Sequence, residues 1–364
     1  MRIDPICRME VDESTALTTE ADGAVVYFCS EGCKDRFLAN EGTHLTRTTY
    51  DLVIIGGGPA GLTAAVYAAT LKMDVLLIAR DLGGQAIDSR KIENYMGFDF
   101  ITGPELVEKF RDQLLHSHYV EHLISEVEQV ETIDGGFAIT TAELERFTTR
   151  TLLLATGMTR RRLGVEGEEQ LQRRGIFYGN VQDLAFVQGK AVAVVGGGNS
   201  ALQMVESLDR IASAIALISD TELTGDPTIV ERIRRQARLT LFEGYKVTAF
   251  HGDERLRGIA LRRLGTGEVR ELPAEGAFIA IGLQPNTGLV RELVETNDRG
   301  EIRVGSNCAT TRPGIFAAGD CTNAFGKRII IASGEGAKAA LAARQHILQL
   351  RREAKGHVAS EANP

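Results

Sequence analysis

One glycine-rich turn occurs twice in this chain, and it limits the folds that the chain can adopt. The first copy, IGGGPAG, covers residues 55–61, and the second, VGGGNSA, covers residues 195–201. Each copy follows an apolar run typical of a buried strand and precedes a stretch with helical periodicity. Glycines at such a turn let the backbone approach a diphosphate, whose charge then meets the helix N-terminus. Two turns therefore predict two nucleotide sites.

The pattern beyond residue 49 predicts the fold class. Strand-like and helix-like segments alternate there, which indicates α/β domains with parallel sheets and helices on both faces. The second turn lies about 140 residues after the first, a spacing that suits one Rossmann-like domain inserted in another. Residues 1–45 hold three of the five cysteines and are expected to form a separate small α+β domain.

Composition excludes several classes of function. The formal net charge of -8 argues against a nucleic-acid partner. No apolar run has membrane-spanning length, and the opening MRIDPICRME contains no apolar signal core. The cysteines are odd in number and mostly far apart, which argues against a disulfide framework. We therefore expect a protein of the reducing cytoplasm with no membrane segment.

A series of short motifs accompanies the first turn and carries a family resemblance. The motifs are GGQ at 83–85, IENY at 92–95, LLLATG at 152–157, AFIAIGLQPN at 277–286, GIFAAGDC at 314–321 and IIIASGEGAKAAL at 329–341. In this order they resemble the low-molecular-weight thioredoxin reductases, and most closely the flavoprotein subunit of alkyl hydroperoxide reductase.

The resemblance covers residues 49–350 and implies a domain order. FAD would bind at the first turn and NAD(P)H at the second. The expected segments are an N-terminal cysteine domain at 1–45, a first part of the FAD domain at 49–160, the NAD(P)H domain at 161–279, a second part of the FAD domain at 280–350, and a tail at 351–364.

The same resemblance implies which residues bind FAD. They are Gly56, Gly58, Pro59, Ala60, Gly61, Gly84, Gln85, Asn94, Ala155, Thr156, Gly157, Gly319, Asp320, Ile329 and Ile330. Asp320 would hydrogen-bond the ribityl and diphosphate region, although an aspartate there can also be a helix cap. The acid that usually holds the adenosine ribose is absent, because the strand VLLIAR ends in Ala79 and Arg80. Asp81 or backbone groups are the available substitutes.

The second turn gives a prediction about the nicotinamide cofactor. The expected contacts are Gly196, Gly198, Asn199, Ser200, Ala201, Ser219, Asp220 and Gly282. NADPH-using relatives place a His-Arg-Arg-like cluster where this chain has Ser219 and Asp220. A carboxylate accepts hydrogen bonds from a ribose 2'-hydroxyl and repels a 2'-phosphate, so we expect NADH. The alternatives are that Asp220 is an ordinary surface acid, or that Arg232, Arg234 and Arg235 fold back to the nucleotide.

A redox motif of the thioredoxin reductases is absent. Those enzymes carry C-x-x-C followed by Asp shortly before the second glycine turn. Here the segment reads FYGNVQDLAFVQGKAVAVV, which places Gly179 and Gln182 where the two cysteines would stand. Without a sulfur nucleophile no internal disulfide can pass electrons on, so we do not expect an ordinary thioredoxin reductase. Cys308 and Cys321 are expected to be small packed residues.

The N-terminal block carries a second resemblance. Its segments DPICRMEVDESTA and VYFCSEGCKDRF resemble the YHS family of small metal-associated domains. Ser30 has the position of an N-cap, so Cys29 and Cys33 would face the same way at the start of a short helix. With Cys7 they offer three soft ligands for Zn²⁺ or Cu(I), and His44 or a water is the candidate fourth ligand. A structural clip and a working metal or redox site both fit this pattern.

Together these features predict an FAD-dependent NADH:acceptor oxidoreductase. The candidate acceptors are a metal or thiol at the N-terminal domain, an external disulfide, a quinone-like molecule or oxygen. Two other classes stay open: a metal-binding, redox-sensing module with slow NADH turnover, and a flavin-binding partner protein without turnover. The apolar stripe of EGAKAALAARQHILQL is consistent with a homodimer.

Overall fold

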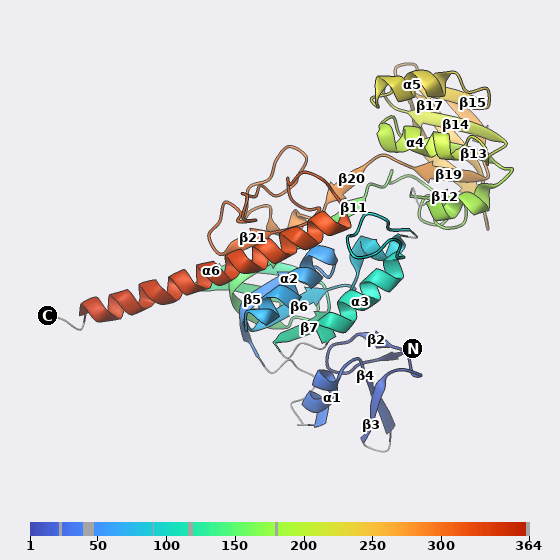
Figure 1. The fold of residues 1–364 in the computed structure, drawn as a ribbon. Helices are drawn as coiled ribbons and strands as arrows, with labels where there is room; N and C mark the ends of the chain where they lie inside the picture. The colour runs from blue at the N-terminus through green and yellow to red at the C-terminus, as the bar shows by residue number, and fades with distance from the viewer. Residues whose placement is uncertain (22–23, 39–46, 90, 116–118, 179–180, 362–364) are drawn as a thin grey trace. The chain divides into compact units, whose positions relative to one another are not determined.

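The chain forms two compact units. The structure, a computed structural model, describes residues 1–364 except 22–23, 39–46, 90, 116–118, 179–180 and 362–364. The first unit combines residues 1–158 and 285–364, and the second comprises residues 159–284 (Figure 1). Strand β11 (Met158–Arg160) pairs with β20 (Leu283–Pro285) where the chain passes from one unit to the other. The second unit is therefore an insertion in the first.

The N-terminal part of the first unit is a small α+β domain. Its elements are β1 (Arg2–Ile3), β2 (Glu10–Val11), β3 (Leu17–Ala21), β4 (Ala24–Phe28) and α1 (Glu31–Leu38). Strands β1 and β2 pair antiparallel, as do β3 and β4. Phe28 is fully buried and its ring lies 5.2 Å from that of Phe37, which joins the second hairpin to α1.

A seven-stranded sheet forms the centre of the first unit. Its order is β7-β6-β5-β10-β9-β8, and β21 pairs with the second half of β10. The bounds are β5 (Thr49–Ile55), β6 (Val75–Ala79), β7 (Val120–Ile124), β8 (Val127–Ile133), β9 (Gly136–Thr141), β10 (Arg146–Leu154) and β21 (Ile315–Ala317). Strands β7, β6, β5, β10 and β21 are mutually parallel, whereas β8 and β9 add an antiparallel edge.

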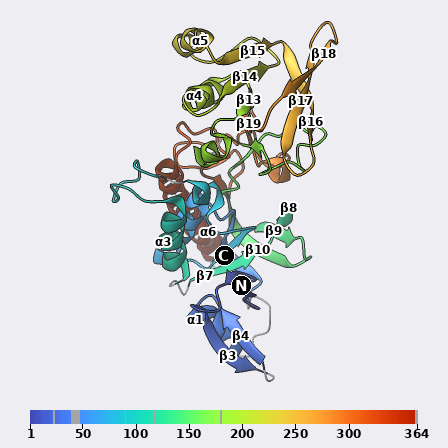
Figure 2. The same ribbon diagram turned by 90° about the vertical axis from the view of Figure 1, so that its right-hand side faces the viewer.

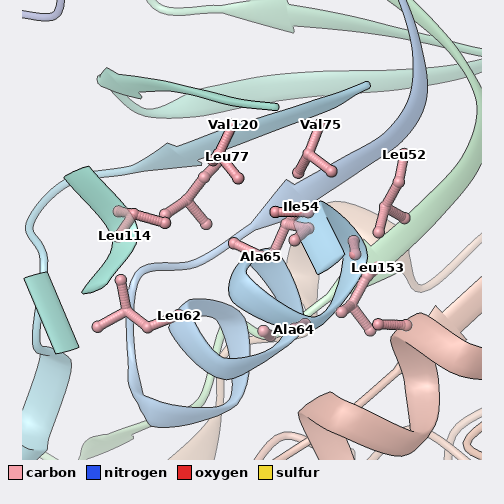
Figure 3. Close-up of a cluster of buried hydrophobic side chains, with 14 of the residues drawn as sticks. Leu52, Ile54, Leu62, Ala64, Ala65, Val75, Leu77, Leu114, Val120 and Leu153 are labelled. Atoms are coloured by element: carbon pink, nitrogen blue, oxygen red, sulfur yellow. The ribbon is translucent and has the colours of Figure 1, made fainter. Parts of the chain in front are cut away.

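Helices cover this sheet because its strands are apolar on both faces. The helices are α2 (Pro59–Thr70), α3 (Gly103–Leu115) and α6 (Ile329–Glu361), with short turns η1 (Gly84–Asp88) and η3 (Gly288–Val290). In Figure 3, Leu52, Ile54, Leu77, Val120 and Leu153 of the strands meet Leu62, Ala64 and Ala65 of α2 and Leu114 of α3. The alanines on α2 let the helix lie close to the sheet.

The apolar stripe of the long helix α6 packs against other residues of the first unit. Ala339, Ala340, Ala343 and Ile347 are fully buried in the same core as the alanines of α2. The stripe that suggested a homodimer from the sequence is therefore occupied by packing within the first unit. Among the described residues, no helix combines the length and the apolarity needed to cross a membrane.

The second unit is built on a five-stranded parallel sheet (Figure 2). Its order is β12-β19-β13-β14-β15, with bounds β12 (Ile176–Phe177), β19 (Gly276–Ile279), β13 (Ala191–Val195), β14 (Ala214–Ser219) and β15 (Leu239–Glu243). Helices α4 (Asn199–Leu208), α5 (Pro227–Arg234) and η2 (Val181–Val187) accompany it. A three-stranded antiparallel sheet consists of β16 (Tyr245–Gly252), β17 (Leu256–Arg263) and β18 (Val269–Pro273). The predicted α/β fold class with parallel sheets is confirmed.

Candidate nucleotide sites and a cysteine–histidine cluster

The first glycine turn joins β5 to α2, and two of its glycines are required by close packing. Gly56 has φ 114°, and a Cβ there would lie 2.3 Å from the Ala155 carbonyl oxygen. A Cβ at Gly61 would lie 1.9 Å from the Gly56 carbonyl oxygen. These two positions therefore accept only glycine, because the backbones of β5, β10 and α2 approach too closely for a side chain.

Gly58 is different, because no described atom lies within 4 Å of the position of a Cβ there. It is the N-cap of α2, its φ of -76° is ordinary, and no described side chain caps this helix start. The open side of Gly58 and the uncapped first turn of α2 form a cradle that fits a diphosphate.

The turn after β6 and the segment before α6 approach the first glycine turn. A Cβ on Gly84 would lie 3.1 Å from Gly58 Cα, and one on Gly319 would lie 3.0 Å from Ala60 Cβ. The structure therefore brings together three of the predicted FAD segments. Asp81 Oδ1 accepts a hydrogen bond from Gly84 N–H at 2.8 Å, so this carboxylate shapes the turn.

Other predicted FAD residues take local positions around this cradle. Gln85 donates to the Met158 carbonyl oxygen. Thr156 Oγ1 donates to the Asn286 carbonyl oxygen at 2.7 Å, and Asn286 N–H donates to Gly157 O at 3.0 Å. Asn94 is exposed. At the start of α6, Ile329 packs on Ile92, Ile101 and Leu106, whereas Ile330 is exposed.

Two carboxyl groups lie near the Gly319 turn. Burial raises the pKa of Asp320, an effect that Lys327 and Arg328 oppose. Burial also raises the pKa of Glu335, whose Oε2 accepts a hydrogen bond from Gly319 N–H at 2.8 Å. Sequence reasoning missed Glu335. The sequence feature that could have indicated Glu335 is an acidic residue among the small residues of SGEGAK, on a helix face that is otherwise mostly apolar.

The second glycine turn repeats this arrangement in the second unit. A Cβ at Gly196 would lie 2.4 Å from the Ala280 carbonyl oxygen, whereas no described atom lies within 4 Å of one at Gly198. Gly198 is the N-cap of α4, and no described side chain caps that helix. Ala201, which replaces the third glycine, is fully buried behind the turn, and Ser200 is exposed. This cradle also fits a diphosphate.

The end of β14 lies against the second turn. Ser219 is buried, its Oγ would lie 2.5 Å from a Cβ on Gly197, and it has no hydrogen-bond partner among the described residues. Asp220 follows it and is exposed. Asn199 Oδ1 accepts from Asp226 N–H at 2.7 Å, and Gly282 O accepts from Arg161 N–H at 3.1 Å.

The arginines considered for a 2'-phosphate are engaged elsewhere. Arg232 forms an ion pair with Glu206, Arg234 with Glu243 at 2.6 Å and Arg235 with Glu231. All three arginines are largely exposed, and ion pairs at such positions are weak.

A third site lies in the first unit, where Cys7, Cys29, Cys33 and His122 converge. Their four ligand atoms all lie within 4.8 Å of one another. Cys29 Sγ is 3.4 Å from Cys7 Sγ, 3.7 Å from Cys33 Sγ and 3.7 Å from His122 Nε2. The cysteines are free thiols in this structure. Sequence reasoning missed His122, which lies in the strand VEHLI and far from the cysteines in sequence; its suggested fourth ligand, His44, lies outside the described residues.

Asp4 and Ser30 hold the cysteine segments in place. The fully buried carboxylate of Asp4 accepts from Ile6 N–H at 2.8 Å, Cys7 N–H at 3.3 Å and Cys29 N–H at 2.8 Å. Ser30 Oγ accepts from Cys33 N–H at 3.2 Å, so α1 begins with the predicted cap. One buried carboxylate therefore ties the two halves of the cysteine pattern together.

Without a cation the three thiols compete for ionisation. Hydrogen bonds from Cys29 and Cys7 hold the pKa of Cys33 far below its usual range. Hydrogen bonding to its neighbours and burial raise the pKa of Cys7. A bound cation removes this competition, since three thiolates then surround a positive charge. The donor set fits a soft divalent or monovalent ion.

Comparison with known families decides the assignment. A family model described as pyridine nucleotide-disulphide oxidoreductase matches residues 50–346. The chain belongs to this family. A second model, described as YHS domain, matches residues 2–48. Both resemblances drawn from the motifs are confirmed. Membership in the pyridine nucleotide-disulphide oxidoreductase family makes the chain an enzyme of this class and implies FAD and NAD(P) as its cofactors.

Similar proteins are named for related activities. A protein named NADH dehydrogenase from Ferdinandcohnia aciditolerans is 33% identical over 304 residues, which are 82% of this chain and 58% of that protein. The F subunit of alkyl hydroperoxide reductase from Staphylococcus aureus is 35% identical over 306 residues, 82% of this chain and 59% of that protein. The chain thus matches less than two thirds of the length of these relatives.

Solved structures match over nearly their whole length. Thioredoxin reductase of Lactococcus lactis is 34% identical with a TM-score of 0.67, covering 82% of this chain and 99% of that one. Thioredoxin reductase of T. acidophilum is 31% identical with a TM-score of 0.66, covering 83% and 100%. The thioredoxin reductase-like fold predicted from the motifs is therefore confirmed.

This family member has no cysteine in the second unit. The chain contains five cysteines: three form the cluster with His122, and Cys308 and Cys321 are buried in the first unit. Cys321 Sγ contacts the Ala318 carbonyl oxygen at 3.4 Å, as expected of a packed residue. Gly179 lies outside the described residues, and Gln182 lies in η2. Residues of this segment cannot supply a thiol pair.

Proposed function

We propose that this protein is an FAD-dependent NADH:acceptor oxidoreductase whose acceptor is not thioredoxin. The observation that carries the proposal is the pair of cradles at Gly58 and Gly198, combined with a chain that has no cysteine in the second unit. Two nucleotide cradles support hydride transfer between two cofactors. The missing dithiol means that electrons leave by another route.

Each cradle has defined roles for its residues. In the first, the open side of Gly58 and the N-terminus of α2 would hold the FAD diphosphate, and Asp320 would accept hydrogen bonds from hydroxyl groups beside it. In the second, Gly198 and the N-terminus of α4 would hold the NADH diphosphate. When bound, FAD supplies the hydride acceptor, which no side chain of the chain can replace.

NADH is the proposed reductant. Asp220 would accept hydrogen bonds from the 2'-hydroxyl of the adenosine ribose, and the unpartnered hydroxyl of Ser219 would add a second polar contact. A 2'-phosphate would bring two like charges together at this position.

The proposed acceptor is an external molecule that takes electrons from the reduced protein directly. External disulfides, quinone-like molecules and oxygen are the candidate classes. The test is steady-state NADH consumption with each class in turn. A rate stimulated by one of them supports the proposal, whereas stimulation by thioredoxin alone or a complete lack of NADH oxidation contradicts it.

We propose that Cys7, Cys29 and Cys33 bind one soft metal ion, Zn²⁺ or Cu(I).

We also propose a homodimer, because α6 still exposes Leu341, Leu348 and Leu350 although its alanine stripe is buried. The molar mass of the purified protein, measured by light scattering, tests the proposed homodimer. A monomer at micromolar concentration contradicts it.

A further inference from the structure

The geometry points to a single Zn²⁺ that clamps the N-terminal domain onto the edge of the seven-stranded sheet, with His122 as its fourth ligand. Cys7, Cys29 and Cys33 come from the N-terminal domain, whereas His122 belongs to β7. The inference extends the metal site by one ligand from another domain. It does not depend on which nucleotide or acceptor the enzyme uses.

The distances match a tetrahedral site. Ligand atoms about 2.3 Å from a zinc ion at tetrahedral angles lie about 3.8 Å from one another. Cys29 Sγ is 3.4 Å from Cys7 Sγ, 3.7 Å from Cys33 Sγ and 3.7 Å from His122 Nε2, and all four ligand atoms lie within 4.8 Å of one another. A disulfide would need sulfurs about 2 Å apart. The cluster is thus preformed for a metal ion.

The ligand set selects the ion and its role. Three thiolates with one imidazole are a common set for structural Zn²⁺. Cys7 and Cys33 are buried, and His122 is only 6% exposed. Four protein ligands leave no open coordination position for a substrate, and Zn²⁺ has no redox chemistry. The structure therefore favours the clip over the working redox site among the two roles that the sequence left open.

The two domains already share a buried surface at this place. Ile6 and Met9 of the N-terminal domain lie in the same core cluster as Val120 of β7 and Leu114 of α3. Residues two apart on a strand face the same side, so His122 points where Val120 points. The imidazole therefore reaches the cysteines from a strand whose neighbouring side chains already pack on their domain.

Polar contacts align the domains around the cluster. The Cys7 carbonyl oxygen accepts from Ile124 N–H at 3.0 Å, which pairs the edge strand β7 with the metal-binding loop. Arg8 forms ion pairs with Glu143 at 3.2 Å and Glu145 at 3.0 Å. Partly exposed ion pairs contribute little by themselves. A metal ion bound by both sides would hold the docked arrangement more firmly than these ion pairs.

The test uses the full-length protein and two readouts. Zinc affinity is measured by competition with a chromophoric chelator, and hydrogen exchange is measured for a peptide that contains Ile124. His122→Ala should weaken zinc binding by more than about 100-fold, beyond the loss typical of an outer-shell residue. It should also speed exchange at Ile124, because the Cys7 carbonyl is no longer held there. Removing zinc from the unchanged protein should speed the same exchange.

Two further variants separate ligand loss from misfolding. His251→Ala removes an exposed histidine of the second unit and should change neither readout. His122→Cys restores a ligand atom and should recover zinc binding and slow exchange, whereas a purely structural role of the imidazole predicts no recovery. Zinc affinity within about threefold of normal in His122→Ala overturns the inference. The inference is also overturned if the rate of hydrogen exchange at Ile124 is the same with and without zinc, or if the cysteines form a disulfide instead of binding a metal ion.

Discussion

His122 Nε2 lies 3.7 Å from Cys29 Sγ although 93 residues separate the two in sequence. The contact brings a side chain of the edge strand β7 to the three cysteines of the N-terminal domain. Metal binding and domain docking are therefore expected to be one event.

The Asp4 carboxylate should strengthen metal binding without touching the metal. It accepts hydrogen bonds from the backbone of both cysteine segments, which orients the thiolates. We expect Asp4→Asn to lower zinc affinity by about 10–100-fold, because an amide cannot accept at both oxygen positions. Chelator competition measures the change. Asp12→Asn, at an exposed acid of the same domain, is the control, and equal effects of the two would contradict this role.

Adding a side chain at Gly58 should affect FAD binding, whereas adding one at Gly61 should affect the stability of the fold. At Gly58 the protein leaves open space, so Gly58→Val should keep the fold and lower FAD content severalfold by filling the diphosphate cradle. At Gly61 a methyl group meets the Gly56 carbonyl, so Gly61→Ala should destabilise the protein itself by about 1–3 kcal/mol. Flavin absorbance and thermal unfolding distinguish the two. Full FAD content in Gly58→Val would disprove the cradle.

Asp220 should set the preference for NADH. Asp220→Arg should narrow or invert the ratio of flavin reduction rates with NADH and NADPH, because an arginine attracts the 2'-phosphate that the carboxylate repels. Stopped-flow reduction over a range of nucleotide concentrations gives the limiting rate divided by Kd for each nucleotide, and hence the ratio. Asp253→Arg adds the same charge at an exposed loop of the second unit and should leave it unchanged. NADPH clearly ahead in the unmodified protein would contradict the assignment.

Local patterns predicted the parts of the sites that lie close together in the chain. The strand–glycine–helix order at Gly56 and Gly196 defines both cradles, because each is made by consecutive residues. Ser30 predicted the start of α1 in the same way. His122 could not be predicted, since a histidine in an apolar strand gives no sign of its partners. The engagement of Arg232 with Glu206 likewise depends on the packing of α5 beside α4.

Glu335 should make thermal stability depend on pH with a definite sign. Burial raises its pKa above the ordinary 4.5, so the folded state keeps a proton that the unfolded state has already lost. The contribution of Glu335 to the free energy of unfolding is complete below about pH 4.5, and it is lost as pH rises through the raised pKa. Glu335→Gln keeps an oxygen to accept from Gly319 N–H. The melting temperature of the variant, relative to that of the unmodified protein, should therefore increase as pH rises above about 4.5. A constant difference would refute the assignment.

The stoichiometry of anaerobic reduction by NADH tests the central claim most directly. FAD takes up two electrons, and a redox-active disulfide would take up two more. The chain has no dithiol at the position that Gly179 and Gln182 occupy. Its five cysteines are free thiols, which are already reduced. Titration of the FAD-loaded protein, followed by flavin absorbance, should therefore end at one NADH per FAD. An end point at two NADH per FAD would show a reducible disulfide and contradict the account.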